Sequence, residues 1–216
     1  LLVANHSGTV PYDAAILSVG IHNETGRFVR GLAEKHIKNT SEKFYNFLKQ
    51  CGGIEGRRNN AIELLKNDEL VLVCPGGADD LGKLWYEKYM INKVKGFKEG
   101  KGGYIKCALA AETPIVPVTL VGAEEIHYNV FKSKWLGKKL KMPYFPIPIN
   151  LMPLPAKVYV RFGKPIDFSK EYGPEDANNQ EIVDKLNNEV RLRMQSMIYD
   201  VCSRRKGTFF SRLKKR

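Results

Sequence analysis

The sequence predicts an α/β fold: a mostly parallel central sheet flanked by helices, built as a single domain. Short apolar runs alternate along the chain with amphipathic stretches, which is typical of repeated strand–helix units. The run "LVLV" at 70–73 is apolar throughout, as expected of a strand that is buried on both faces. With 216 residues, the chain is long enough for one sizeable core and short for two ordinary domains.

Each element follows from a local pattern. We expect strands at 1–5, 27–34, 69–77, 113–122 and 156–166, and helices at 11–20, 41–51, 59–68, 102–112 and 178–205. Pro11 suits the first turn of its helix, and Ser41 suits the capping position of the next one. The last helix is predicted from apolar residues at near-helical spacing: Ile182, Leu186, Val190 and Met194.

The charge and the cysteines narrow the class of partner. A formal net charge of +12 favours an anionic partner: nucleic acid, a phospholipid surface or a cofactor that carries phosphates. We find no recognisable nucleic-acid motif and therefore expect no nucleic-acid partner. The four cysteines lack a CxxC pair, which argues against a metal site. Cys74 and Cys107 lie in apolar stretches and are interpreted as small buried hydrophobic residues.

Two segments combine apolar and basic or proline residues. Residues 142–156 hold five of the eleven prolines, so we expect an extended apolar loop that packs on its own core or forms a lip against lipid or an acyl chain. The tail at 207–216 mixes cations with phenylalanine, as in a solvated end or a contact with an anionic membrane. The predicted domain is therefore 1–206, followed by the basic aromatic tail. Because Leu1 lies inside a predicted strand, we expect the natural N-terminus to lie upstream.

The stretch "NHSGTVPYD" at 5–13 places His6 and Asp13 between a strand and a helix. A neutral histidine accepts a proton from an alcohol, and a carboxylate on its other nitrogen fixes the tautomer and stabilises the imidazolium. Such a pair without its own nucleophile suits activation of a substrate hydroxyl. Ser7 is a poor nucleophile for His6, because adjacent residues at a strand end point to opposite sides, and there is no G-x-S-x-G elbow.

A near-match to a phosphate-binding loop runs from Gly77 to Lys83. Leu84 stands where that motif needs a magnesium-binding hydroxyl, and Asp79 and Asp80 would place negative charge inside the phosphate cradle. We therefore reject a P-loop.

Four motifs in order resemble the glycerolipid acyltransferases related to bacterial lysophosphatidate acyltransferase: "NHSGTVPYD", "GGIEGRRNNAIELL", "LVLVCPGGADD" and "TPIVPVTLVGAEE". The resemblance extends from the first motif through "RFGKPIDF" at 161–168. The P-G-G third motif is similar to that of relatives of type-2 diacylglycerol acyltransferase. The resemblance implies transfer of an acyl group from acyl-CoA or acyl carrier protein to a glycerolipid or lysophospholipid hydroxyl, with no other cofactor and no metal.

By similarity, His6 is the general base and Asp13 its orienting partner. The resemblance also implies substrate-binding residues: Arg57, Arg58, Pro75, Gly76, Gly77 and Pro117. Six residues separate His6 from Asp13, where the common motif has four. Gly76 replaces the usual glutamate of the third motif, and Asp79 stands near the place of its arginine, which favours a neutral glycerolipid acceptor.

We expect membrane association at the cytosolic face, with an acyl donor, a glycerolipid acceptor and an anionic membrane surface as partners. The alternative is a non-catalytic protein that binds lipid surfaces with the same fold. Replacement of His6 by alanine distinguishes the two, because it abolishes turnover only in an enzyme.

Overall fold

The structure is a computed structural model that describes residues 1–6, 12–33, 42–77, 80, 82–91, 95–139 and 144–205, with the side chains of 44 and 95 excepted. Five predicted features lie outside the described residues: Ser7, Pro11, the capping Ser41, Asp79 and the basic tail at 207–216.

The core of the described chain is a six-stranded sheet in the order β3-β2-β4-β1-β5-β8. Its strands are β1 (Leu2–Ala4), β2 (Val29–Ala33), β3 (Gly53–Glu55), β4 (Leu70–Val73), β5 (Val116–Val121) and β8 (Tyr159–Phe162). The first five are parallel, and β8 pairs antiparallel with β5 at the edge. The prediction of a mostly parallel sheet is confirmed, although the short β3 was not predicted.

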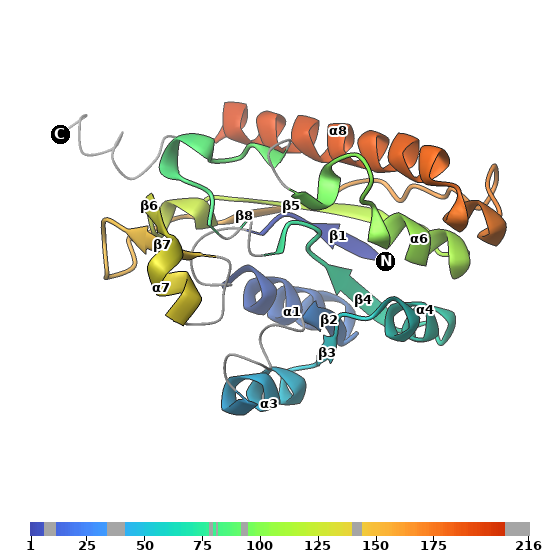
Figure 1. Cartoon of the computed structure of the whole chain (residues 1–216), viewed down its shortest axis with the longest axis horizontal. Helices are drawn as coiled ribbons and strands as arrows, with labels where there is room; N and C mark the ends of the chain where they lie inside the picture. The colour runs from blue at the N-terminus through green and yellow to red at the C-terminus, as the bar shows by residue number, and fades with distance from the viewer. Residues whose placement is uncertain are drawn as a thin grey trace.

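Helices cover both faces of this sheet (Figure 1). The α-helices of the described residues are α1 (Tyr12–Thr25), α3 (Glu42–Gln50), α4 (Arg58–Lys66), α6 (Gly103–Ala110) and α8 (Gln180–Arg204), together with α7 (Lys134–Lys139), which lies beside β7 (Phe145–Pro148) (Figure 1). Because successive strand residues point to opposite faces, β1 contributes Leu2 and Ala4 to a cluster with α1, and Val3 to a cluster with α4, α6 and α8.

The long helix α8 forms as predicted. Its buried stripe includes Leu186, Val190, Met194 and Ile198, at spacings of four residues. The Asn179 side chain caps the helix by accepting hydrogen bonds from two backbone N–H groups of the first turn. The stripe packs on the same face of the sheet as α6, where Figure 1 shows the two helices side by side.

The prediction of a loop throughout 142–156 is wrong in part. Within the described residues, β7 (Phe145–Pro148) pairs antiparallel with β6 (Asn129–Ser133), and α7 lies between them in the chain. Prolines are tolerated here because each strand of a two-stranded ribbon has a free edge to which a residue without an N–H can turn. The extended, irregular part of the prediction is found after β7, at 149–156.

The carboxyl ends of the parallel strands share one edge of the sheet. Segments that follow β1, β4 and β5 therefore meet there, as do the first residues of the helices that leave those strands. Figure 1 shows β6, β7 and α7 together at this end of the molecule. Within the described residues, no helix combines the length and the apolar character needed to cross a membrane.

Candidate active site

His6 and Asp13 are in direct contact at the carboxyl edge of the sheet. The Nδ1 atom of His6 lies 2.6 Å from Oδ2 of Asp13. Asp13 is 1% exposed because it belongs to the buried stripe of α1, one turn before Leu17 and two before Ile21. The His6 side chain keeps 17% of its surface exposed. The carboxylate thus holds one ring nitrogen from inside the protein, and the spacing of six residues does not prevent the contact.

A second bond fixes the Asp13 carboxylate. Its Oδ1 accepts a hydrogen bond from the Ala14 backbone N–H at 2.8 Å, in the first turn of α1. A carboxylate in the first turn is also favoured by the partial positive charge of a helix N-terminus. These interactions fix the Asp13 carboxylate in place against the His6 ring.

Cys74 joins this pair, which the sequence did not predict. One polar atom from each of Cys74, His6 and Asp13 lies within 4.8 Å of the other two. Burial favours the neutral form of the His6 ring, but the Cys74 sulfur and the Asp13 carboxylate outweigh burial and hold the pKa of His6 well above its usual value. Burial raises the pKa of the Cys74 thiol, so the thiol is neutral at pH 7. The Asp13 carboxylate, and not the Cys74 thiol, is then the negatively charged neighbour of His6.

The same three donors could in principle hold a zinc ion, which binds histidine nitrogen, thiolate and carboxylate oxygen. Zinc would require a deprotonated Cys74 and would have to displace the short contact between His6 and Asp13. The raised pKa of Cys74 opposes the first requirement. The arrangement fits a hydrogen-bonded base better than a metal centre.

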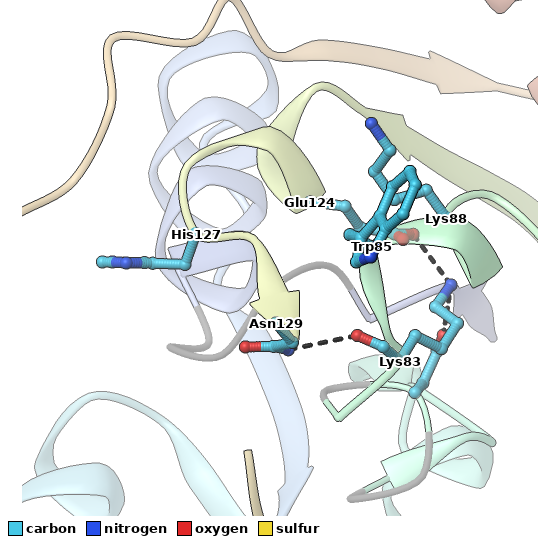
Figure 2. Close-up of a pocket in the computed structure, with 7 residues that line it drawn as sticks. Lys83, Trp85, Lys88, Glu124, His127 and Asn129 are labelled. Carbon is cyan, nitrogen blue, oxygen red and sulfur yellow. Dashed lines mark hydrogen bonds and ion pairs between the residues drawn. The ribbon is translucent and has the colours of Figure 1, made fainter. Parts of the chain in front are cut away.

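Asp80 positions the backbone of His6. The His6 N–H donates to Oδ2 of Asp80 at 2.8 Å, and the other oxygen of Asp80 lies 2.7 Å from Nζ of Lys83. Lys83 also pairs with Oε1 of Glu124 at 2.8 Å, and Glu124 accepts from the Tyr89 backbone N–H. Figure 2 shows the contact between Lys83 and Glu124, which belongs to the 3₁₀ helix η4 (Ala123–Glu125). The network ties the segment after β1 to the segment after β5.

This network also explains why Lys83 is no phosphate ligand. Burial lowers the pKa of Lys83, but Asp80 and Glu124 more than compensate, so that its pKa lies above the usual value and it stays charged. Burial raises the pKa of Glu124, and the adjacent lysine opposes that shift.

The small cavity between Lys83 and His127 has a volume of about 10 Å³, which is room for about one water and too small for a phosphate group.

The glycine-rich turn after β4 lies beside His6. Val73 of β4 is level with Val3 of β1, so that the residues following the two strands are neighbours. The Gly77 N–H donates to the Cys74 carbonyl at 3.1 Å, and Gly77 has φ +47°, in the region that favours glycine. The turn is packed closely against Gly96, where a Cβ would lie 1.9 Å from the Pro75 carbonyl oxygen.

A family model described as Acyltransferase matches residues 1–121, which is more than half of the chain. The chain belongs to the acyltransferase family. All the contacts of His6 with Asp13 and Cys74 lie within the matched part.

The relatives of this chain include longer proteins. Uncharacterized proteins of Mycobacterium tuberculosis and Mycobacterium leprae are 32% and 31% identical over 220 residues, which is 97% of this chain and 60% and 58% of theirs. The mouse protein named DGAT1/2-independent enzyme synthesizing storage lipids is 25% identical over 193 residues, 88% of this chain and 54% of the relative. The chain thus spans little more than half the length of these relatives. The name of the mouse protein describes an enzyme that synthesizes storage lipids independently of DGAT1/2.

A solved structure shares the fold. The 1-acyl-sn-glycerophosphate (LPA) acyltransferase PlsC from Thermotoga maritima superposes with a TM-score of 0.52 over 95% of this chain and 67% of that chain, at 18% identity. At this identity the match shows that the two proteins have the same architecture.

Three other residues predicted to bind substrate lie farther from His6: Arg57, Arg58 and Pro117. Arg57 and Arg58 follow β3, which is three strand spacings from β1, about 14 Å. Arg57 pairs with Glu55 at 2.9 Å. Pro117 is buried in β5 level with Val3, about 10 Å along the strand from the level of His6. The structure brings together His6, Asp13 and the turn at 75–77, and it leaves the two arginines and Pro117 outside their direct contact.

Proposed function

We propose that the chain transfers a fatty acyl group from a thioester, acyl-CoA or acyl carrier protein, to a hydroxyl of a glycerolipid or lysophospholipid. Membership of the acyltransferase family supports acyl transfer, and the names of the Thermotoga and mouse proteins support a lipid acceptor. The observation that carries the proposal is the 2.6 Å contact between His6 and the buried Asp13.

In the proposed reaction, Nε2 of neutral His6 takes the proton of the acceptor hydroxyl. The oxygen attacks the thioester carbonyl carbon and forms a tetrahedral intermediate. Asp13 stabilises the imidazolium through Nδ1, which is the state that the raised pKa of His6 favours. The C–S bond then breaks, the thiolate takes the proton from Nε2, and His6 returns to its neutral form. General-base assistance of this kind contributes about 10²–10⁴ in rate.

The turn after β4 is our candidate for stabilising the tetrahedral oxyanion. Backbone N–H groups are effective there because they are fixed before the reaction begins. The Gly77 N–H is already bonded to the Cys74 carbonyl, so we assign the role to the Gly76 N–H. Gly76 is buried in the turn and follows β4, the neighbour of β1.

The acceptor and the site of action are also proposals. The departures in the third motif favour a neutral glycerolipid, and the distance between Arg57 and His6 leaves the arginine suited to the far end of an acceptor. The net charge of +12 supports association with an anionic membrane, which we place at the cytosolic face.

The test is transfer of radiolabelled acyl groups from acyl-CoA by the purified chain in mixed micelles. The acceptor panel holds lysophosphatidate, a second lysophospholipid, monoacylglycerol and diacylglycerol. We expect product with at least one acceptor, and a loss of about 10²–10⁴ in His6→Ala. His22→Ala is the matched control, since His22 is exposed on α1 and should leave the rate unchanged.

Two results would contradict the proposal. Product formation that persists in His6→Ala would exclude His6 as the general base. Folded protein that binds vesicles but forms no product with any acceptor would favour the alternative, a non-catalytic lipid-surface binding protein.

A further inference from the structure

The ribbon of β6 and β7, together with α7 and the turn after β7, carries exposed apolar side chains. Phe131 of β6 lies opposite Ile147 of β7, and both are exposed. Residues directly opposed in an antiparallel pair lie on the same side of the sheet, and Ile149, two positions after Ile147, continues that side. We call the whole set the ribbon patch: Val130, Phe131, Trp135, Ile147, Ile149, Leu151 and Met152.

The most exposed members are held in place by a well-bonded turn. Leu151 is 90% exposed and Met152 82% exposed. The Asn150 side chain between β7 and this turn donates to the carbonyls of Ile126 and Met152, both at 2.8 Å, and accepts from the Tyr128 N–H at 3.0 Å. Two large apolar side chains are thus presented to the outside by a braced backbone, which is costly in water unless something apolar receives them.

The chain segment that forms the ribbon patch carries positive charge only, although one of its lysines, Lys132, pairs with Glu87 from outside the segment. Residues 126–156 contain five lysines and no aspartate or glutamate. Lys134, Lys138 and Lys139 are exposed on α7, and Nζ of Lys139 lies 4.1 Å from the centre of the Trp135 ring. Tryptophan beside lysine is typical of side chains at the boundary between acyl chains and headgroups, where the ring is apolar and the cation stays hydrated.

The ribbon patch adjoins the candidate active site. The Asn129 side chain of β6 donates to the Lys83 carbonyl at 3.2 Å, and Figure 2 shows this bond. His127 stacks on Tyr12, the residue before Asp13, with ring centroids 6.3 Å apart. A surface that bound the ribbon patch would therefore lie close to His6.

We propose that the ribbon patch docks on the surface of an anionic phospholipid bilayer, with its apolar side chains among the acyl chains and the α7 lysines at the headgroups. The occupant is a bilayer because exposed apolar side chains and exposed lysines occur together on the ribbon and on α7. The inference deepens the proposed function by naming the surface that brings acceptor lipid to His6. Vesicle binding needs no turnover, so its failure is distinct from loss of acyl transfer.

Co-sedimentation measures binding to phosphatidylcholine vesicles with and without phosphatidylglycerol. Removal of a cation near an anionic membrane weakens binding about fivefold, so the triple variant Lys134→Gln/Lys138→Gln/Lys139→Gln should lose about a hundredfold on anionic vesicles and little on neutral ones. The double variant Leu151→Ser/Met152→Ser should lose about tenfold or more on both kinds of vesicle.

Matched controls carry the same changes elsewhere on the surface. Leu192→Ser alters an exposed leucine of α8, and Lys43→Gln/Lys66→Gln/Lys170→Gln removes the same charge from exposed positions outside the ribbon. Unchanged melting temperatures establish that every variant is folded. We expect both controls to bind as the wild type does.

A tryptophan reports insertion directly. The chain has two tryptophans, so in Trp85→Phe the emission comes from Trp135 alone. We expect a blue shift on anionic vesicles and quenching by brominated acyl chains. The inference is overturned if Trp135 is not quenched, if Leu151→Ser/Met152→Ser binds like the wild type, if the controls lose as much as the ribbon variants, or if light scattering shows a dimer that the double variant dissociates.

Discussion

Replacing Asp13 by asparagine removes the negative charge beside His6 and keeps the size of the side chain. In the wild type, the charged oxygen lies 2.6 Å from Nδ1 in a site where Asp13 is 1% exposed. The amide oxygen of asparagine can still accept the bond from Nδ1, so the ring stays near its position. What is lost is the stabilisation of the imidazolium that forms when His6 takes a proton.

The expected size of the effect follows from that bond. A hydrogen bond to a charged partner contributes about 1.5–3 kcal/mol and one between neutral groups about 0.5–1.5 kcal/mol, so the change loses about 1–1.5 kcal/mol. Since roughly 1.36 kcal/mol corresponds to tenfold in rate, we expect kcat/KM of Asp13→Asn to fall by roughly 5- to 13-fold. Asp167→Asn removes an exposed aspartate from a surface turn and serves as the control for the change of charge alone.

The pH dependence makes the test specific. Since the pKa of His6 is raised above 6.5, neutral base accumulates as pH rises through that pKa, and wild-type kcat/KM should increase above pH 6.5. In Asp13→Asn this limb should move to lower pH. The stability contributed by the raised pKa is present below pH 6.5 and is lost as pH rises through the folded-state value, so the variant's deficit in melting temperature should shrink over that window. A fall in rate without movement of the limb would refute the reasoning.

Two further predictions concern stability around the site. Lys83→Met leaves the buried carboxylates of Asp80 and Glu124 without the cation that lies 2.7 and 2.8 Å from them, and should lower the free energy of unfolding by about 3–5 kcal/mol in urea titrations. Lys66→Met is the control, because Lys66 is exposed and its loss should not lower the free energy of unfolding. Equal unfolding midpoints for the two variants would contradict the importance of the buried ion pairs. Gly96→Ala places a Cβ 1.9 Å from the Pro75 carbonyl oxygen and should cost about 1–3 kcal/mol together with acyl-transfer rate, since the glycine-rich turn must shift. Gly20→Ala on α1 meets nothing within 4 Å and should not lower stability or rate, since alanine inside a helix is about 0.5–1 kcal/mol more favourable than glycine; equal melting temperatures for the two alanine variants would disprove the close packing.

Local patterns determined most of the fold. Apolar runs bounded by turns placed β1, β2, β4, β5 and β8, and the helical spacing of apolar residues placed α8 to within two residues of its observed start. Parallel strands that end at one edge also made the meeting of the first and third motifs foreseeable. The ribbon was missed in part, because β7 contains two prolines and its pairing depends on a partner, β6, from before α7.

The histidine and the aspartate of the candidate site were predicted from sequence because they sit on one strand–helix connection. Tertiary structure alone decided which groups surround them. Cys74 was interpreted as a packing residue, and Asp80 entered only as an argument against a P-loop, yet one lies beside the His6 ring and the other accepts the His6 N–H. Glu124 meets Lys83 across 41 positions of the chain. Periodicity reports which face a side chain occupies, whereas the contacts between ends of different strands depend on strand order, which no local pattern encodes.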